Sequence, residues 1–225
     1  MPFIILLERK FLSIKVNSYY FLRERVSSEK LADIEGFSHS LVPKKQLQQL
    51  ETLYIDLTKS EEELYKSLHR TNRKQIKKAV CKNLYIEVLE KPLMEDVVNT
   101  MNKLKVKNAL VITKVMNEAK EVLCYRVYIT DGSIAFCLYS ASHFRMKEKT
   151  EEKRLLSEAN RYLIWKNILF LKEQKHKIFD MGGLTANQNI RNFKMEFGGE
   201  IAHVYSGYKA NSRIGQFVLW IRAKK

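Results

Sequence analysis

The chain has 225 residues, a length that suits one large domain or one domain with a small appendage. Hydrophobic residues make up 45% and charged residues 29%, with only 3 prolines, so a globular protein without long disordered linkers is expected. The formal net charge of +15 favours polyanionic partners: nucleic acid, phosphate-bearing small molecules or an anionic membrane face. A lysine-rich, solvated surface explains the charge equally well when it is taken alone.

The cysteines and histidines give no sign of disulfides or of a metal site. Cys81, Cys124 and Cys137 show no CxxC spacing, and the last two lie in apolar runs where cysteine acts as a small buried hydrophobe. The 5 histidines are scattered without metal-ligand spacing. We therefore expect a reducing, cytoplasmic compartment and no metal. No apolar run approaches the roughly 18 residues of a membrane span, and the apolar start, residues 3–7, is a candidate first strand.

The first half of the chain contains one clear helix signal. Strands are expected at 3–7, 11–16 and 53–57, with a helix near 44–52. A second helix begins at about Ser60 and continues to about residue 79, introduced by two overlapping capping-box patterns, Thr58 with Glu61 and Ser60 with Glu63. Its second half is basic, with Lys66, Arg70, Arg73, Lys74, Lys77 and Lys78 largely on one face. That face is either solvated or a contact for bound phosphate.

The second half alternates strands and helices. A strand at 84–90 precedes a helix from Pro92 to about Leu104. Residues 130–133 (TDGS) are a hairpin signal between two further strands. The complete set of later elements is strands at 109–116, 121–130 and 133–141, a helix at 156–175, a strand at 177–181, a short helix, and strands near 201–208 and 215–222. This order predicts an α+β fold with a mixed, largely antiparallel sheet flanked by helices.

Four motifs resemble those of the FemABX-like aminoacyltransferases, which are part of the GNAT superfamily. They are LYKSLHRTNRKQIKKA (64–79), the long helix with Asn160, Tyr162, Trp165 and Ile168, FDMGGL (179–184) and IRNFKMEFGG (190–199). They occur in the family's order over residues 53–210. The resemblance implies a GNAT-like acyltransferase domain at 53–225 and makes residues 1–52 a candidate remnant of a first GNAT-like half. It also implies that the lysine of the last motif, Lys194, lies at the transfer site.

Lys194 and Asp180 are the candidate catalytic residues. A fixed cation can stabilise the negative oxygen of a tetrahedral intermediate in amide formation, the role that we assign to Lys194. Asp180 ends a strand beside Gly182 and Gly183, where it can accept loop hydrogen bonds or deprotonate an attacking amine. A lysine extended over the rings of Phe193 and Phe197 is the structural alternative for Lys194. The candidate substrate-binding residues are Arg70, Arg73, Lys77, Asn160, Tyr162, Gly182, Gly183, Arg191 and Phe193.

Two features separate the chain from longer or CoA-dependent relatives. Residues 1–52 are too few for a complete second GNAT-like domain. The stretch before the long helix, KEKTEEKRLLSEAN (147–160), lacks the Q/R-x-x-G-x-G/A loop that supplies N–H groups to a pyrophosphate. Ordinary acetyl-CoA binding is therefore not expected.

Two functions of different class fit these observations. The first is an enzyme that transfers an acyl or aminoacyl group to an amine of a phosphate-bearing cell-envelope or sugar precursor, by direct attack. Its donor is an aminoacyl-tRNA or an acyl thioester, no cofactor is held permanently, and peripheral attachment to the inner membrane face through basic residues is compatible with it. The second is a non-catalytic, basic RNA-binding protein that reuses the fold, for which no RNA-binding motif is visible.

Overall fold

The computed structural model describes residues 5–11, 13–24, 32–89, 109–142, 144 and 147–224. The helix expected between Pro92 and Leu104 lies outside them. The chain forms two compact units: one comprises Leu53–Ile201, and the other combines Pro2–Thr52 with Ala202–Lys225. The expected domains, 1–52 and 53–225, stay a prediction, and the compact units group the last 24 residues with the N-terminal segment.

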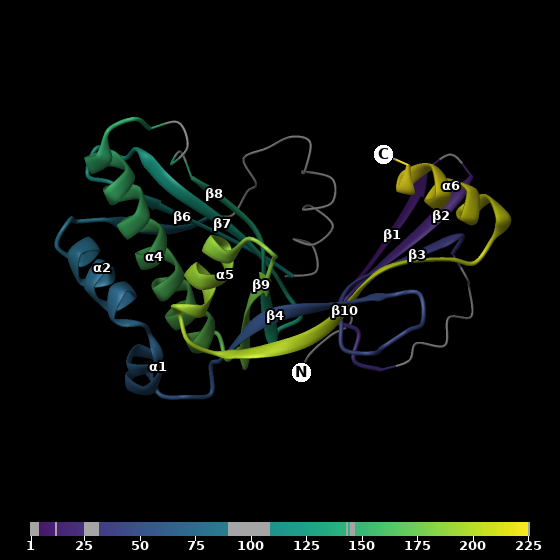
Figure 1. The fold of residues 1–225 in the computed structure, drawn as a ribbon, viewed down its shortest axis with the longest axis horizontal. Coiled ribbons are helices and arrows are strands. Elements are labelled where there is room, and N and C mark those ends of the chain that lie inside the picture. Colours follow the sequence, from purple (N-terminus) through teal and green to yellow (C-terminus); the bar gives the residue numbers. More distant parts are fainter. Residues whose placement is uncertain are drawn as a thin grey trace. The chain divides into compact units, whose positions relative to one another are not determined.

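The larger unit, Leu53–Ile201, contains a sheet in the order β4-β9-β8-β7-β6-β5. Strands β5 to β8 are antiparallel neighbours, and β9 runs parallel to β8. Helix α4 packs across β6, β7 and β8, and α2 packs against α4 (Figure 1). The elements are β4 (Gln48–Asp56), α1 (Glu61–Ser67), α2 (Arg70–Val80), β5 (Tyr85–Leu89), β6 (Leu110–Met116), β7 (Val122–Thr130), β8 (Ile134–Ser142), α4 (Thr150–Glu173), β9 (Ile178–Gly183) and α5 (Gln188–Met195). The expected α+β class with a largely antiparallel sheet is confirmed.

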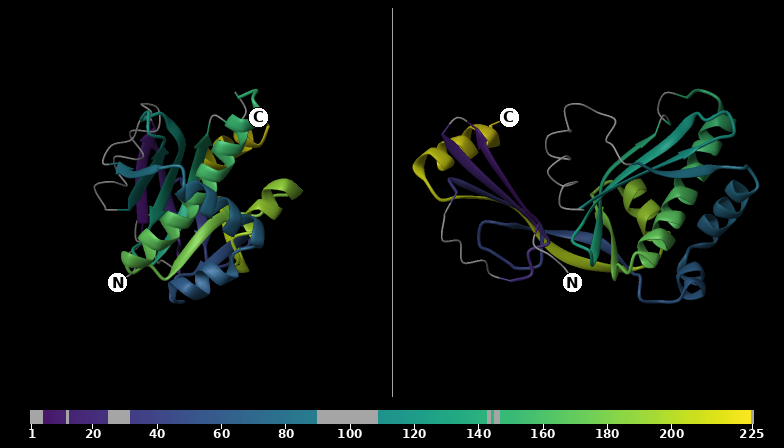
Figure 2. Two further views of the ribbon diagram at one scale, coloured as in Figure 1. Left: turned by 90° about the vertical axis from the view of Figure 1, so that its left-hand side faces the viewer. Right: turned by 180° about the vertical axis from the view of Figure 1, so that it is seen from behind.

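The smaller unit contains strands in the order β1-β2-β3-β10. The C-terminal helix of this unit, yellow in the right-hand view of Figure 2, lies beside its purple N-terminal strands. The elements of this unit are β1 (Ile5–Phe11), β2 (Ile14–Tyr20), β3 (Ile34–Ser40), β10 (Glu200–Ala210) and α6 (Arg213–Ala223). Strands β2 and β3 are parallel, whereas β1 with β2 and β3 with β10 are antiparallel. Strands β4 and β10 are the two places where the chain passes from one unit to the other.

Two sequence-based assignments were wrong. Residues 48–52, expected to be helical, belong to β4, because Leu53 and Ile55 are buried with the two-residue period of a strand. Residues 215–222, expected to be a strand, belong to α6. The Ser212 hydroxyl accepts a hydrogen bond from the Gly215 N–H and so caps this helix, which overrides the strand preference of its β-branched and aromatic residues.

The expected helix at 60–79 is two helices with a break at His69. Ser60 and Glu63 form the expected capping box of α1. Thr58 does not take part, since its hydroxyl and N–H both bind Asp56 instead. At the break, the His69 ring accepts from the Thr71 N–H and caps α2, while the His69 N–H donates to the carbonyl oxygen of Glu196. The break therefore connects the start of α2 to the end of α5.

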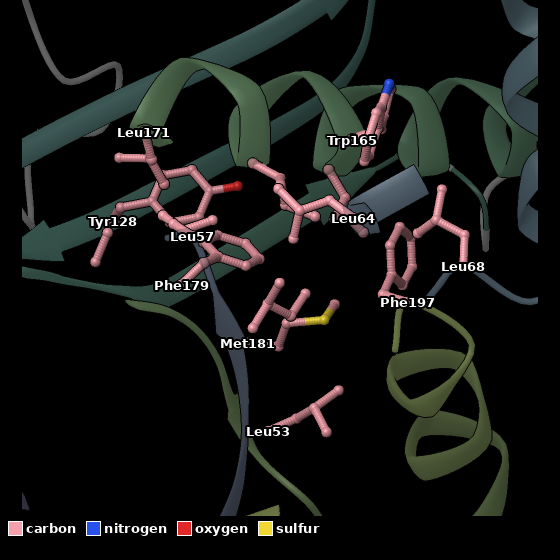
Figure 3. Close-up of a cluster of buried hydrophobic side chains, with 14 of the residues drawn as sticks. Leu53, Leu57, Leu64, Leu68, Tyr128, Trp165, Leu171, Phe179, Met181 and Phe197 are labelled. Atoms are coloured by element: carbon pink, nitrogen blue, oxygen red, sulfur yellow. The ribbon is translucent and has the colours of Figure 1, made fainter. Parts of the chain in front are cut away.

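The main hydrophobic core of the larger unit fixes the end of β9. Side chains from β4, α1, α4 and β9 converge there, and Phe197 packs between them from the segment after α5 (Figure 3). Phe179 is fully buried and lies 5.6 Å from Tyr128 between ring centroids. Each fully buried side chain of this size stabilises the fold by about 1.5–3 kcal/mol. The core thus holds β9, which carries Asp180, and the end of α5, which carries Lys194.

Two consecutive glycines follow α5 and allow the chain to approach β4 closely. Gly198 and Gly199 have φ values of 76° and 100°, in the region that glycine favours. A Cβ on Gly199 would collide with the carbonyl oxygen of Tyr54, and one on Gly198 would come within 2.8 Å of the Ser67 carbonyl oxygen. Both glycines are therefore required by the packing of the chain.

Candidate active site

The candidate active site lies where β8 and β9 part. Their parallel pairing extends from Ile134 and Ile178 to Phe136 and Asp180, although β8 continues to Ser142 and β9 to Gly183. On the other side of β8, its pairing with β7 shifts register between Val127 and Tyr128. Ligands of open α/β sheets bind at the carboxyl ends of parallel strands, next to such a divergence. The opening therefore brings together backbone from β9 and side chains from β7, β8 and α5.

Lys194 reaches this opening from α5. Its Nζ donates a 2.8 Å hydrogen bond to the carbonyl oxygen of Gly183. The Asp180 Oδ1 accepts a 2.8 Å bond from the Gly182 N–H, and Asp180 is fully buried. Gly182 has a φ of 82°, and a Cβ there would lie 3.3 Å from the Cys137 carbonyl oxygen and 3.5 Å from Lys194 Nζ. Only glycine provides both the backbone conformation and the room for the lysine.

The electrostatics around Lys194 are those of a partly desolvated cation. Burial lowers the pKa of Lys194, and the positive charge of Arg126 lowers it further. Cys137 and Asp180 act in the opposite direction and favour the charged ammonium. A cation held in a site with little water interacts more strongly with a developing negative charge than the same cation in solvent.

Arg126 is the second cation of this cluster, it is buried, and the sequence reasoning missed it. The residue is 5% exposed, and its guanidinium donates to the Asn160 Oδ1 at 2.9 Å and to the Cys137 Sγ at 3.3 Å. Its Nε has no hydrogen-bond partner within the described part of the chain. The available signal was a single arginine inside the apolar run VLCYRVYIT of β7, at a position that alternation places inward.

Six of the candidate substrate-binding residues fall into two separate groups. Gly182, Gly183 and Asn160 belong to the cluster around Lys194 and Arg126. Arg70, Arg73 and Lys77 line instead a hollow of about 520 Å³ on α1 and α2, together with Tyr65, Lys66 and Lys74. Lys66 is paired there with Glu62 at 2.6 Å, and the Arg73 guanidinium donates to the Lys66 carbonyl oxygen at 3.0 Å. We call this surface the basic hollow.

Phe193 and Tyr162 have packing contacts that explain them without a ligand. The Phe193 ring lies 5.5 Å from that of Phe197 and 4.8 Å from the Arg161 guanidinium. Tyr162 is partly buried against the core and lies beneath Lys166. Arg191 is partly buried one turn before Lys194 on α5. Substrate contact by these three residues stays a prediction.

Arg161 of α4 holds α5 in place and was also missed. Its guanidinium donates to Asn72 of α2 at 2.6 Å, to Ser157 at 2.7 Å and to Glu196, the C-cap of α5, at 3.0 Å. Arg161 therefore connects three helices next to the segment that carries Lys194. It is a positioning residue for the site.

No group of three or more His, Cys, Asp or Glu side chains among the described residues could hold a metal ion. None of the helices that the structure describes is long and apolar enough to cross a membrane.

Comparison with solved structures places the fold. The chain is similar to FemX, with a TM-score of 0.60 and 11% identity over 95% of this chain and 86% of FemX. It is also similar to the C-terminal domain of a protein assigned as a lysylphosphatidylglycerol synthetase from Agrobacterium fabrum, with a TM-score of 0.52 and 10% identity over 98% of this chain and 84% of that domain. No protein-family model matches the chain, and no curated protein sequence matches it.

These similarities show that the chain has the fold of FemX and of that C-terminal domain. The resemblance expected from the four sequence motifs is thereby confirmed at the level of the fold.

Proposed function

We propose that the protein is an acyltransferase that forms an amide by direct attack of an amine on an activated acyl group. The observation that carries the proposal is the Lys194 ammonium, held on the Gly183 carbonyl oxygen in the opening between β8 and β9. The amine nitrogen forms a new bond to the acyl carbon, and the bond from that carbon to the leaving oxygen or sulfur breaks. Lys194 stabilises the negative oxygen of the intermediate, a contribution of several kcal/mol at sites of this kind.

In this mechanism Asp180 shapes the site around Lys194. Its buried carboxylate holds the Gly182 N–H and favours the charged form of Lys194. Both features support positioning over proton abstraction. The general-base role stays a prediction, and the proton that leaves the amine then goes to water or to the leaving group.

The donor that we favour is an aminoacyl ester, such as an aminoacyl-tRNA. A thioester of coenzyme A needs N–H groups at a helix N-terminus for its pyrophosphate. Helix α4 instead begins at Thr150, its N-cap residue Lys149 makes no side-chain capping bond, and Glu151 and Glu152 lie in its first turn. Those carboxylates oppose a pyrophosphate at this position. No permanently held cofactor is part of the proposal.

The acceptor that we favour bears phosphate, with cell-envelope or sugar precursors as the candidate class. The support is the basic hollow, where five cationic side chains and Tyr65 surround one depression. FemX and the lysylphosphatidylglycerol synthetase domain share the fold. The reducing cytoplasm remains the expected compartment, because the three cysteines are free thiols.

The test is mass spectrometry of products after incubation with charged tRNA or acetyl-CoA, each with a pool of amino-sugar and peptide precursors. An acceptor heavier by one amino-acid residue supports the proposal. An acceptor heavier by one acetyl group would instead show that the donor is a thioester and contradict the aminoacyl donor.

The RNA-binding alternative rests on the basic hollow and gains no support from the comparisons. It predicts RNA binding that weakens steeply with salt, and no product in any of these incubations.

A further inference from the structure

Helix α6 is attached to the smaller unit by one narrow face. Gly215 is its one buried residue, and a Cβ there would collide with the Asp33 carbonyl oxygen next to β3. Val218 and Leu219 are partly buried on the same side. The spacing 215, 218, 219 is that of one helical face, so this side packs on the unit and the opposite side is directed outward.

The outward side of α6 is apolar. Ile214, Phe217, Trp220 and Ile221 are 55%, 59%, 54% and 42% exposed. Spacings of three, four and seven residues place Ile214, Phe217 and Ile221 in one row, with Trp220 beside it. The Phe217 and Trp220 rings stack with their centroids 6.0 Å apart. A soluble protein rarely exposes such a group of large apolar side chains without a partner.

Cations border this apolar face. The Lys224 ammonium lies 3.7 Å from the centroid of the exposed Trp220 ring. Arg222, seven residues after Gly215, lies instead on the packing side, with its guanidinium 4.2 Å from the centroid of the Tyr208 ring of β10. Arg213 occupies the first position of the helix, and residues 213–225 contain no aspartate or glutamate. Aromatic and aliphatic residues bordered by arginine and lysine are typical of helices that lie in the interface of a bilayer.

We propose that α6 is a membrane-docking helix, which inserts its apolar face into the surface of an anionic bilayer. The charge pattern decides between this occupant and a second copy of the chain. A symmetric dimer through the same face would bring Arg213 and Lys224 against their own counterparts, with no acidic residue of the helix to compensate them. Anionic headgroups provide the opposite charge, at about 1 kcal/mol for each basic residue near the surface. The inference does not depend on the proposed chemistry.

The test is cosedimentation with vesicles of phosphatidylcholine alone and of phosphatidylcholine with phosphatidylglycerol, for the wild type and for Phe217→Ser/Trp220→Ser. The matched control is Val80→Ser/Tyr85→Ser, which removes two apolar side chains of similar exposure, 58% and 56%, from the larger unit. Circular dichroism establishes that each variant is folded. We expect the wild type and the control to bind the anionic vesicles, and the α6 variant to bind roughly tenfold more weakly or worse.

Fluorescence gives a second readout that unfolding would not imitate. The chain has 2 tryptophans, and Trp165 is buried at 6% exposure whereas Trp220 is exposed. Acrylamide quenching of the exposed component should fall when anionic vesicles are added, and added salt should reverse the effect. Equal vesicle binding by the wild type and the α6 variant would overturn the proposal. So would an absence of binding, or a concentration-dependent dimer that only the α6 variant abolishes.

Discussion

The Lys194 ammonium and the Gly183 carbonyl oxygen are joined by a 2.8 Å hydrogen bond across the opening between β8 and β9. Both residues lie in the stretch FDMGGLTANQNIRNFKMEFGG (179–199), and the bond connects the end of β9 to helix α5. Gly182 leaves room for the lysine, and Gly198 and Gly199 follow the C-cap of the helix that carries it.

The rate of transfer should fall at high pH because Lys194 must be charged. Burial lowers the pKa of Lys194 from its ordinary value of 10.5, so the active, protonated form is lost as pH rises through a value below that. Asp180 opposes this shift, and Asp180→Asn removes its negative charge. The descending limb of kcat/KM against pH should therefore move to lower pH in that variant. An unchanged limb in Asp180→Asn would contradict the assignment to Lys194.

The side chains of the basic hollow should contribute to the affinity for the acceptor and not to the chemical step. Arg70→Ala/Lys77→Ala should raise KM for a phosphate-bearing acceptor about tenfold or more and leave kcat within about twofold, because these side chains line the hollow and not the Lys194 cluster. The matched control is Lys120→Asn/Lys175→Asn, which removes two exposed charges at positive-φ positions that asparagine tolerates. Steady-state kinetics at two salt concentrations measures both. A loss of kcat with unchanged KM would exclude the hollow as the acceptor site.

Removing Lys82, the ion-pair partner of the buried Glu158, should destabilise the fold. The Glu158 side chain is 2% exposed and pairs at 2.6 Å with Lys82, which is 39% exposed. Lys82→Met leaves a buried carboxylate without its cation and should lower the free energy of unfolding by about 1–3 kcal/mol. The double variant Lys82→Met/Glu158→Gln should regain most of this loss in urea denaturation. Equal stabilities of the wild type and Lys82→Met would show that the pair contributes nothing.

Gly199→Ala should destabilise the larger unit more than an ordinary surface substitution. A positive φ costs a residue with a Cβ about 1–2 kcal/mol, and the collision with the Tyr54 carbonyl oxygen adds to that. We expect a loss of at least about 2 kcal/mol in the free energy of unfolding. Asn192→Ala, an exposed position on α5, is the control and should change stability by less than about 0.5 kcal/mol. A Gly199→Ala protein as stable as this control would refute the close approach.

Local signals in the sequence predicted several parts of this structure correctly. The capping box of Ser60 and Glu63 and the turn between β7 and β8 both depend on neighbouring residues alone. The motif that contains Lys194 implied a transfer site at this lysine, which stays a prediction; the structure adds that its ammonium lies beside Gly182 and Gly183. Spacing along one face of a helix also predicted that Arg70, Arg73 and Lys77 would gather on one surface.

Other parts depend on contacts between distant residues, which a single sequence does not show. Arg126 and Cys137 are 11 residues apart and meet only because β7 and β8 pair in one register. The break at His69 depends on a hydrogen bond to Glu196, far away in the chain. Strand β4 and helix α6 were misassigned because local propensity favoured the opposite element, which tertiary packing and the Ser212 cap override.

The most direct test of the account is single-turnover transfer by Lys194→Met, which keeps the length of the side chain and removes its charge. Mass spectrometry of the acceptor gives the rate, and thermal unfolding shows whether the fold is intact. We predict a rate about 10²–10³ times lower than that of the wild type, with a Tm within a few degrees of it. A rate within about twofold of the wild type in the folded variant would contradict the assignment of Lys194 to the transfer chemistry.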